Sequence, residues 1–252
     1  MARKLLTIII PVRREEKTIQ KTITVLEKAV RTPHTICIAD DTIDPSDRTL
    51  SIIRKLNYSF LTVSKKKQSH KDGFGPALIR AVKTVKTPYT IFVMADLSDE
   101  PKSIDTMVQQ AEREKYAIVC GCRYMAGAKK IGGPKVQGAL SSALNAILYR
   151  FLGVPTRDAT NAFKLFRTDF LQSVLPKFPE TGVEFSLQLM MEAMKKKPKI
   201  IDVPTVWRGR EQGVSKVKLL HRGPKYIRLL WSIVLFHRKT FFKHACITVL
   251  TR

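Results

Sequence analysis

Short apolar segments alternate with segments of helical spacing through the first half of the chain. Runs rich in Ile, Val and Leu predict strands, and longer segments with apolar residues three or four positions apart predict the helices between them. The predicted strands are residues 5–10, 35–38, 60–63, 90–93 and 117–122, and the predicted helices are 15–30, 47–56, 75–85 and 101–114. This alternation is typical of an α/β fold with a mostly parallel, Rossmann-like central sheet and flanking helices.

The alternation lapses near residue 124. Glycines and lysines concentrate in residues 126–138, which predicts a basic loop. Beyond it the pattern predicts a helix at 139–152, a strand at 163–166, a helix at 184–196 and a strand at 199–203. We therefore expect one α/β domain over residues 1–222, followed by a basic amphipathic segment over residues 223–252.

Composition and charge restrict the possible partners. The chain has 252 residues, and 44% of them are apolar, enough to build a full core. Its 45 Lys and Arg against 21 Asp and Glu give a formal charge of +24, which favours an anionic partner such as a nucleic acid, a phospholipid surface or a phosphorylated substrate. A nucleic-acid-binding protein is an alternative of another class that would also explain this charge. The sequence has neither the aromatic pairs of an RNA-reading sheet nor a recognised DNA-reading helix, so no nucleic-acid partner is expected.

Cysteine usage and hydropathy indicate the compartment. Four cysteines, without CxxC spacing, favour a reducing, cytosol-facing compartment over a disulfide scaffold or a zinc site. Residues 1–4 lead straight into the first predicted strand, unlike a signal peptide. No segment reaches the roughly eighteen apolar residues of a membrane span. We expect a peripheral protein at the cytoplasmic face of a membrane, without a transmembrane span.

Three oxygen-bearing side chains follow the predicted strand at 90–93. They are Asp96, Ser98 and Asp99. Open α/β sheets bind ligands at this edge, and Mg²⁺ is commonly held by carboxylates together with substrate phosphates. The first hypothesis is a diphosphate bridged by Mg²⁺ or Mn²⁺. The alternative is that these residues cap the following helix.

Acidic residues also follow two other predicted strands. Asp40 and Asp41 end the strand at 35–38, and Glu15 and Glu16 follow the first strand. Parallel strands would bring these carboxylates to one edge of the sheet, where they could accept hydrogen bonds from the base and ribose of a nucleotide. We favour that function for Asp41 and local capping for Asp44.

Seven short motifs follow one another along the chain. They are IIIP with Glu15 and Glu16 (8–16), DD (40–41), GFGPA (73–77), ADLS (95–98), GCRY (121–124), DATNAF (158–163) and REQGVSK (210–216). In this order they resemble the family 2 glycosyltransferases, most closely the dolichol-phosphate mannose synthase-like branch. The resemblance covers nearly the whole chain and implies the GT-A fold, to which the C-terminal sequence pattern adds amphipathic helices.

The resemblance also implies ligands. They are a nucleoside-diphosphate sugar of the GDP-mannose or UDP-glucose type, a divalent metal and a polyprenyl phosphate acceptor. The donor-binding residues that it implies are Pro11, Glu15, Asp40, Asp41, Gly75, Asp96, Arg210, Ser215 and Lys216. The implied metal site is Asp96 with Ser98 and Asp99, and the implied catalytic residues are Asp96, Arg123, Asp158, Arg210 and Lys216.

Arg123 and Asp158 take distinct roles in this resemblance. Arg123 faces the acceptor phosphate, because a guanidinium matches phosphate geometry with paired donors. That phosphate is already anionic and can attack the sugar without a general base, so Asp158 orients sugar hydroxyls or the basic groups around the phosphate. One alternative is a glycolipid or polysaccharide hydroxyl as the acceptor, for which Asp158 or another acid would be the base. The other is a loop-capping role for Asp158.

Three positions depart from the family pattern. Met94 stands where the family commonly has the first Asp of Asp-x-Asp, and a thioether cannot replace an oxygen ligand of Mg²⁺. Asp99 is the candidate to compensate. Arg13 and Arg14 replace a Tyr-Asn pair, and residues 40–49 form a longer loop than usual. The Met94 departure also leaves open a non-catalytic sugar-nucleotide-binding protein.

The C-terminal segment combines apolar and basic residues at helical spacing. Such a helix, here with Trp231, can lie in the headgroup plane of a membrane. The alternative is that its apolar stripe packs on the catalytic domain or on another subunit.

Overall fold

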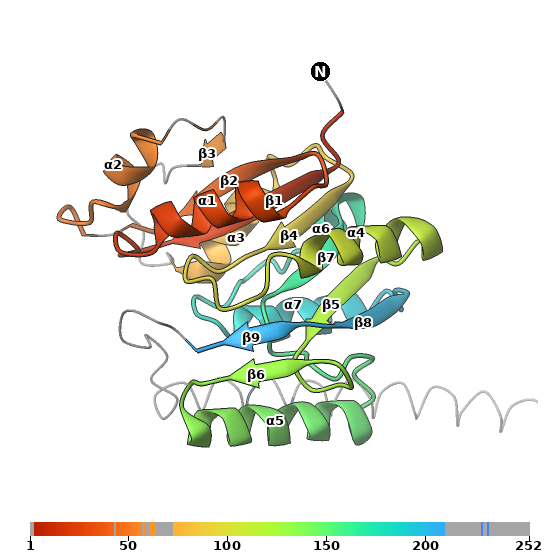
Figure 1. The fold of residues 1–252 in the computed structure, drawn as a ribbon. Helices are drawn as coiled ribbons and strands as arrows, with labels where there is room; N and C mark the ends of the chain where they lie inside the picture. Colours follow the sequence, from red (N-terminus) through yellow and green to blue (C-terminus); the bar gives the residue numbers. More distant parts are fainter. Residues whose placement is uncertain are drawn as a thin grey trace, which may run out of the picture.

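The computed structural model describes residues 3–42, 44–56, 58, 61–63 (backbone only), 73–209, 228 and 231. Its first half contains β1 (Leu6–Val12), α1 (Ile19–Ala29), β2 (His34–Asp40), α2 (Thr49–Arg54), β3 (Leu61–Val63), α3 (Phe74–Val82), β4 (Tyr89–Phe92), α4 (Ser103–Glu114) and β5 (Ile118–Cys122). Its second half contains β6 (Lys129–Ile131), α5 (Lys135–Arg150), β7 (Lys164–Arg167), α6 (Thr168–Ser173), α7 (Phe185–Met194), β8 (Ile200–Pro204) and β9 (Val206–Arg208) (Figure 1).

Seven strands form the central sheet in the order β3-β2-β1-β4-β7-β5-β8. All neighbouring pairs are parallel except those of β7, which runs antiparallel to β4 and β5. The predicted mostly parallel sheet is confirmed. The predicted strands and helices of the first half recur with boundaries that shift by a few residues at most.

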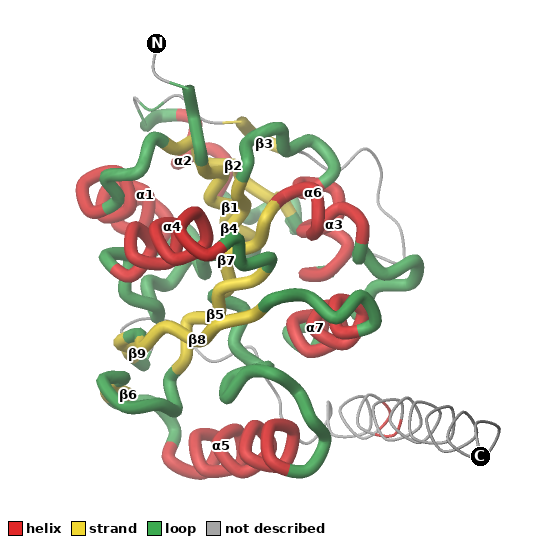
Figure 2. The backbone as a smooth tube through the Cα atoms, turned by 90° about the vertical axis from the view of Figure 1, so that its right-hand side faces the viewer, coloured by secondary structure: helices red, strands yellow, loops and turns green. Residues whose placement is uncertain are grey.

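Helices cover both faces of this sheet. Figure 2 shows α1 and α4 on one face and α3, α6 and α7 on the other. Alternate residues of β1 explain the two cores: Ile8 and Ile10 join the cluster that includes α1 and α4, whereas Ile9 joins the cluster that includes α3 and α7. A strand buried on both faces reads as a continuous apolar run, as β1 does.

A second, two-stranded sheet overturns one prediction. The predicted basic loop 126–138 contains β6, which pairs in parallel with β9, and it also contains the first turn of α5. The helix predicted to begin at residue 139 therefore begins at Lys135. Local sequence could not show the β6 strand, because its three residues are exposed and gain their partner from a segment more than 70 positions away. The short elements α6 and β9 were not predicted either.

Most of the C-terminal segment lies outside the described residues. Arg228 and Trp231 are helical, Trp231 is exposed, and the guanidinium of Arg228 pairs with the carboxylate of Glu180. Among the described residues, no helix combines the length and apolar character needed to cross a membrane.

Gly121 allows β5 to pack closely against Phe163. A Cβ at this glycine would lie 2.3 Å from Cδ1 of the Phe163 ring. We expect Gly121→Ala to lower the free energy of unfolding by about 1–3 kcal/mol, the usual effect of overpacking. Urea denaturation measures it, and the added substitution Phe163→Leu should recover part of the loss. An unchanged midpoint for Gly121→Ala would contradict the close packing.

Candidate active site

The carboxyl ends of three adjacent strands carry the predicted acidic residues. β2, β1 and β4 are parallel neighbours, and Val12 of β1 lies opposite Asp40 of β2. The segments that follow these strands therefore start from the same edge of the sheet. The predicted convergence of acidic segments at this edge is confirmed.

Asp40 and Asp41 are buried at the end of β2. The backbone N–H of Thr42 donates to Oδ1 of Asp40 at 2.8 Å, and Arg80 donates to the Asp40 carbonyl oxygen at 3.3 Å. Oδ2 of Asp41 lies 3.7 Å from Nη1 of Arg13. Loop residues thus contact both carboxylates, and α3 contacts the backbone of Asp40, at the place where the sequence predicts the nucleoside.

Arg14 closes a small pocket beside these acids. Its backbone N–H donates to Asp47 and its guanidinium to Asp44, each at 2.7 Å. Hydrogen bonds from Ser46, followed by that of Arg14, lower the pKa of Asp44 to about 2. The pocket is lined by Arg13, Arg14, Asp44 and Asp47. The capping predicted for Asp44 is wrong, because this carboxylate binds Ser46 and Arg14, whereas Asp47 accepts the backbone N–H of Thr49 at the start of α2. Arg13 and Arg14 contribute directly to the lining of the pocket.

Three other predicted donor-binding positions have structural explanations. Pro11 is buried in β1 opposite Ala39. The Glu15 carboxylate accepts a hydrogen bond from the Thr18 hydroxyl at the start of α1. Gly75 lies in the first turn of α3, where a Cβ would be 2.1 Å from the Glu180 carbonyl oxygen. Donor binding by these residues stays a prediction.

The predicted metal site centres on Asp96, just beyond β4. Its Oδ1 accepts a hydrogen bond from the backbone N–H of Ser98 at 3.1 Å, and the carboxylate is partly exposed. The buried Ser98 accepts a backbone hydrogen bond from Arg208 at 2.7 Å. Within the described residues, no group of three His, Cys, Asp or Glu could hold a metal ion. Mg²⁺ needs only one or two carboxylates when substrate phosphates supply further oxygens, so Asp96 fits such a site.

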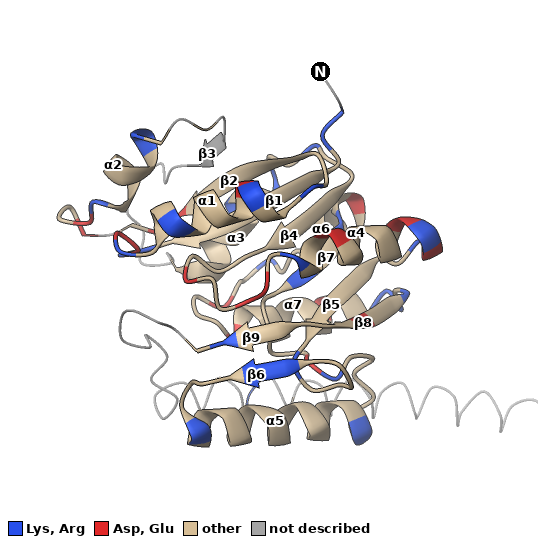
Figure 3. Ribbon diagram, viewed as in Figure 1, with Lys and Arg blue, Asp and Glu red and all other residues tan. Residues whose placement is uncertain are grey.

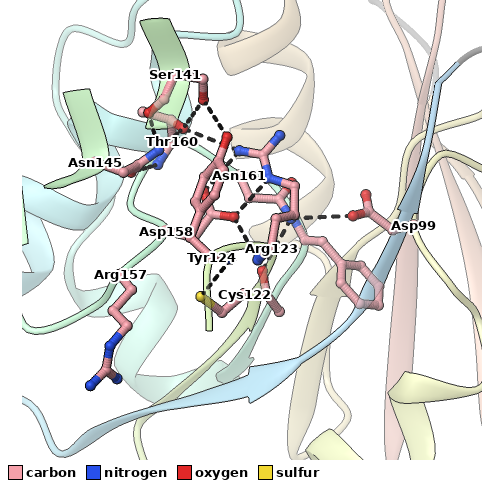
Figure 4. Close-up of polar contacts among 12 residues, drawn as sticks. Asp99, Cys122, Arg123, Tyr124, Ser141, Asn145, Arg157, Asp158, Thr160 and Asn161 are labelled. Atoms are coloured by element: carbon pink, nitrogen blue, oxygen red, sulfur yellow. Dashed lines mark hydrogen bonds and ion pairs between the residues drawn. The ribbon is translucent and has the colours of Figure 1, made fainter. Parts of the chain in front are cut away.

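Asp99 binds Asn161 and does not cap the following helix, α4, as the alternative expected. It is 3% exposed, and its Oδ1 accepts a hydrogen bond from Asn161 at 3.2 Å (Figure 4). Asn161 also donates to the Gly121 carbonyl oxygen at 3.1 Å. Burial raises the pKa of Asp99 to about 6, although Asn161 and Arg123 both act to lower it. This carboxylate links the segment that follows β4 to the loop that carries Asp158.

The raised pKa of Asp99 predicts a pH-dependent stability in the metal-free protein. The folded state holds this proton more tightly than the unfolded state, so the stabilisation is complete below pH 4 and is lost as the pH rises through about 6. Asp99→Asn should remove this dependence and raise the free energy of unfolding at pH 7.5 by up to about 3 kcal/mol relative to wild type. Urea denaturation at pH 4.5 and 7.5 checks it; equal effects of the substitution at both values would contradict it.

A buried ion pair joins Arg123 to Asp158. The guanidinium donates to the carboxylate through Nε at 2.7 Å and Nη2 at 2.8 Å, and the Arg123 backbone N–H adds a third bond at 3.0 Å (Figure 4). Asp158 is fully buried. Burial alone would lower the pKa of Arg123, but Asp158 outweighs it and raises that pKa. The guanidinium also lies 5.2 Å from the Tyr124 ring centre and 6.0 Å from that of Trp207.

A polar network connects this pair to α5. The Thr160 hydroxyl accepts from Arg123 at 3.3 Å and from Asn145 of α5 at 2.8 Å. The Tyr124 hydroxyl donates to Ser141 of α5 at 3.0 Å. The position of α5 is therefore coupled to that of Arg123.

Sequence reasoning missed two residues of this region. Lys164 is buried in β7 and donates to the carbonyl oxygens of Ala159 and Asn161, which fixes the turn that presents Asp158. Burial lowers the pKa of Lys164. Asn145 is buried on α5. The available signal was a single polar residue within an apolar segment, in FKLF for Lys164 and in ALNAIL for Asn145.

The predicted site residues Arg210, Ser215 and Lys216 lie outside the residues that the structure describes.

Residues 7–175 match the profile of glycosyl transferase family 2. The chain therefore belongs to this family, as the motifs predicted.

Curated relatives match the chain at low identity. Glycosyltransferase AglD of Haloferax volcanii is 21% identical over 93% of this chain and 38% of its own length. Undecaprenyl-phosphate mannosyltransferase of Micrococcus luteus and polyprenol monophosphomannose synthase of Mycolicibacterium smegmatis are each 25% identical, over 58% and 60% of this chain. The chain spans 38% to 61% of the lengths of these relatives.

Solved structures show the same fold. Glucosyl-3-phosphoglycerate synthase from Mycobacterium tuberculosis, in complex with Mn²⁺, UDP and phosphoglyceric acid, gives a TM-score of 0.67 at 17% identity, over 91% of this chain and 78% of that chain. S. aureus TarS in complex with UDP-GlcNAc gives 0.60 at 17% identity, over 83% and 60%. The predicted GT-A fold is confirmed.

Proposed function

We propose that the protein transfers one hexose, mannose or glucose, from a nucleoside-diphosphate sugar to a polyprenyl phosphate, with inversion at the anomeric carbon. The observation that carries this proposal is the environment of Asp158. Its buried carboxylate accepts three hydrogen bonds from Arg123, so it is poorly suited to take a proton from an acceptor. An acceptor phosphate needs no such base, since it is already ionised.

The donor would lie along the acidic edge of the sheet. Asp41 would bind the nucleoside, and Asp40 would hold the loop beside it. Asp96 would hold a divalent cation, Mg²⁺ or Mn²⁺, with Asp99 as the candidate second carboxylate in place of Met94. When bound, such a cation neutralises charge that develops on the departing diphosphate. We assign the same electrostatic role to Arg210 and Lys216, with Ser215 beside them, from their motif.

The acceptor phosphate would meet Arg123. Asp158 engages Nε and Nη2 of this guanidinium and Thr160 accepts a further bond from Nη2, which fixes the plane of the group and orients Nη1. A guanidinium fixed in this way can bind and align a phosphate without rearrangement. The names of two relatives, an undecaprenyl-phosphate mannosyltransferase and a polyprenol monophosphomannose synthase, support an acceptor of this class.

A hydroxyl acceptor is the second candidate. Asp99 favours it, because its pKa, raised to about 6 by burial, suits a general base near neutral pH. This alternative would assign the proton transfer to Asp99 rather than to Asp158.

An acceptor panel with each donor tests the proposal. UDP-glucose and GDP-mannose are incubated with Mg²⁺ or Mn²⁺ and with either a polyprenyl phosphate or the matching polyprenol. We expect transfer to the phosphate with one of the donors and none to the alcohol. Transfer to the polyprenol alone would replace the proposal with the hydroxyl alternative.

We also propose that the protein acts as a peripheral protein at the cytoplasmic face of a membrane. A polyprenyl acceptor resides in a bilayer, and the charge of +24 favours an anionic surface. The exposed Trp231 of the C-terminal segment is compatible with such a contact, whereas the pairing of Arg228 with Glu180 favours packing on the domain at that residue.

A further inference from the structure

A second buried carboxylate supports the loop that carries Asp158. It belongs to Asp202 of β8, whose Oδ1 accepts a hydrogen bond from the Thr156 hydroxyl at 2.5 Å and whose Oδ2 accepts the backbone N–H of Arg157 at 2.8 Å. The Asp202 side chain is 7% exposed, and Thr156 is fully buried. Burial of a carboxylate is costly unless donors satisfy its oxygens, and here both donors come from one loop. Asp202 therefore fixes the loop just before Asp158.

The Thr156 hydroxyl passes this restraint on to Asp158. Because an ionised carboxylate only accepts hydrogen bonds, the hydroxyl donates its single proton to Asp202, and its lone pairs remain to accept. The backbone N–H of Asp158 donates to it at 3.1 Å. The Asp158 carboxylate in turn binds Nε and Nη2 of Arg123. A chain of hydrogen bonds thus connects the guanidinium to Asp202.

The sheet closes this chain into a ring. Strands β5 and β8 are parallel neighbours, with Cys120 opposite Asp202 and Cys122 opposite Pro204. Arg123 directly follows β5. Both ends of the hydrogen-bond chain are therefore attached to adjacent strands of the central sheet.

The loop depends on such contacts for its shape. Residues 151–163, all of which the structure describes, form no helix or strand. Asp202 holds this loop before Asp158, and Lys164 holds it after Asp158 through two carbonyl oxygens. Side chains of opposite charge thus secure both sides of the residue that orients the guanidinium.

We infer that Asp202 is a positioning residue for the acceptor-phosphate site, acting on Arg123 through Thr156 and the loop that follows it. The inference rests on the proposed function, because that function places a phosphate at Arg123. A guanidinium that binds a phosphate must be held within about 0.5 Å of its productive position, and supporting hydrogen bonds supply that precision.

Two substitutions break the chain at different groups. Asp202→Asn cannot keep both contacts, because a carboxamide offers one acceptor oxygen to two donors. Thr156→Val keeps the shape of the side chain and removes the hydroxyl, whereas Thr156→Ser retains the hydroxyl. The double variant Asp202→Asn/Thr156→Val tests whether the two residues act in one chain. Thermal unfolding is measured for each variant, and Thr156→Val serves the test should Asp202→Asn fail to fold.

Asp105→Asn is the matched control. The Asp105 carboxylate binds donors of the same kind, the Thr32 hydroxyl at 2.7 Å and the backbone N–H of Arg31 at 3.0 Å. It ties the start of α4 to the turn before β2, outside the chain that leads to Arg123. Lys and Arg are spread over many elements (Figure 3), and removal of an acidic residue from a chain of charge +24 by itself favours phosphate binding. Asp105→Asn makes this same change in charge.

Isothermal titration calorimetry of the full chain with farnesyl phosphate and with farnesol measures the contribution of the phosphate group. We expect wild type to bind farnesyl phosphate more tightly than farnesol. Asp202→Asn and Thr156→Val should each weaken the binding of farnesyl phosphate at least about tenfold and leave that of farnesol unchanged, the usual effect of losing a contact behind a binding group. The double variant should bind no more weakly than the weaker single variant. Thr156→Ser and Asp105→Asn should bind as wild type does.

Wild-type phosphate affinity in both Asp202→Asn and Thr156→Val would overturn the inference. An equal loss in Asp105→Asn would also overturn it, because the effect would then reflect a general loss of stability. A wild-type protein that binds farnesyl phosphate no better than farnesol would refute the proposed acceptor site, and the inference with it. The two failures are distinguishable, because the failure of the proposed function shows in the wild type and that of the inference alone shows only in the variants.

Discussion

Asp96→Asn is expected to reduce sugar transfer on the order of 10³-fold, because loss of a metal-binding carboxylate removes several kcal/mol of stabilisation from the leaving diphosphate. The fold should persist, since asparagine keeps the side-chain oxygen that accepts the backbone N–H of Ser98. Initial rates with a saturating nucleotide sugar and Mn²⁺ measure the effect.

Glu100→Gln provides the matched control. Glu100 lies in the same segment and carries a partly exposed carboxylate, 3.8 Å from Arg208. This substitution should leave the rate within about twofold, as expected for an exposed ion pair. Comparable rates for Asp96→Asn and wild type would remove Asp96 from the proposed metal site.

Asp158→Ala is expected to lower the free energy of unfolding by about 3–5 kcal/mol, because it leaves the Arg123 cation buried without its partner. The guanidinium side chain is 12% exposed and the carboxylate is fully buried. Transfer to polyprenyl phosphate should also fall at temperatures where the variant stays folded, since Arg123 loses its orientation. Urea denaturation and initial rates measure the two effects.

A double-mutant cycle with Arg123→Met separates the pair from its surroundings. The coupling between Arg123 and Asp158 should greatly exceed that of Lys195 and Glu192, an exposed pair at 2.6 Å whose loss should change stability by less than about 1 kcal/mol. Equal couplings for the two pairs would contradict the buried, oriented guanidinium.

Local periodicity was sufficient to predict the first half of the fold. Strand β1 is a continuous apolar run, and α1 and α4 have their buried residues at helical spacing, so each element is specified by its own sequence. The acidic edge followed from the order of the elements, because parallel strands end on the same side. The motifs then assigned Asp41, Asp96 and Arg123 to particular roles, which stay predictions.

Long-range contacts account for what the sequence could not show. Strand β6 forms by pairing with β9, which is distant in the chain. The sequence does not predict which carbonyl oxygens accept hydrogen bonds from Lys164, because their positions depend on the turn before β7. The orientation of α5 was also not predicted. Apolar residues at helical spacing are ordinarily assigned to the core, but Leu140 and Ile147 are exposed here and the polar Asn145 is buried.

Characterisation of the reaction product tests the central proposal most directly. NMR spectroscopy of purified product identifies the atom to which the sugar is attached and the configuration of its anomeric carbon. The proposed function predicts a hexose joined through a phosphodiester to the polyprenyl phosphate, with the anomeric configuration inverted relative to the donor. A sugar attached to a hydroxyl oxygen, or a product with retained configuration, would contradict it.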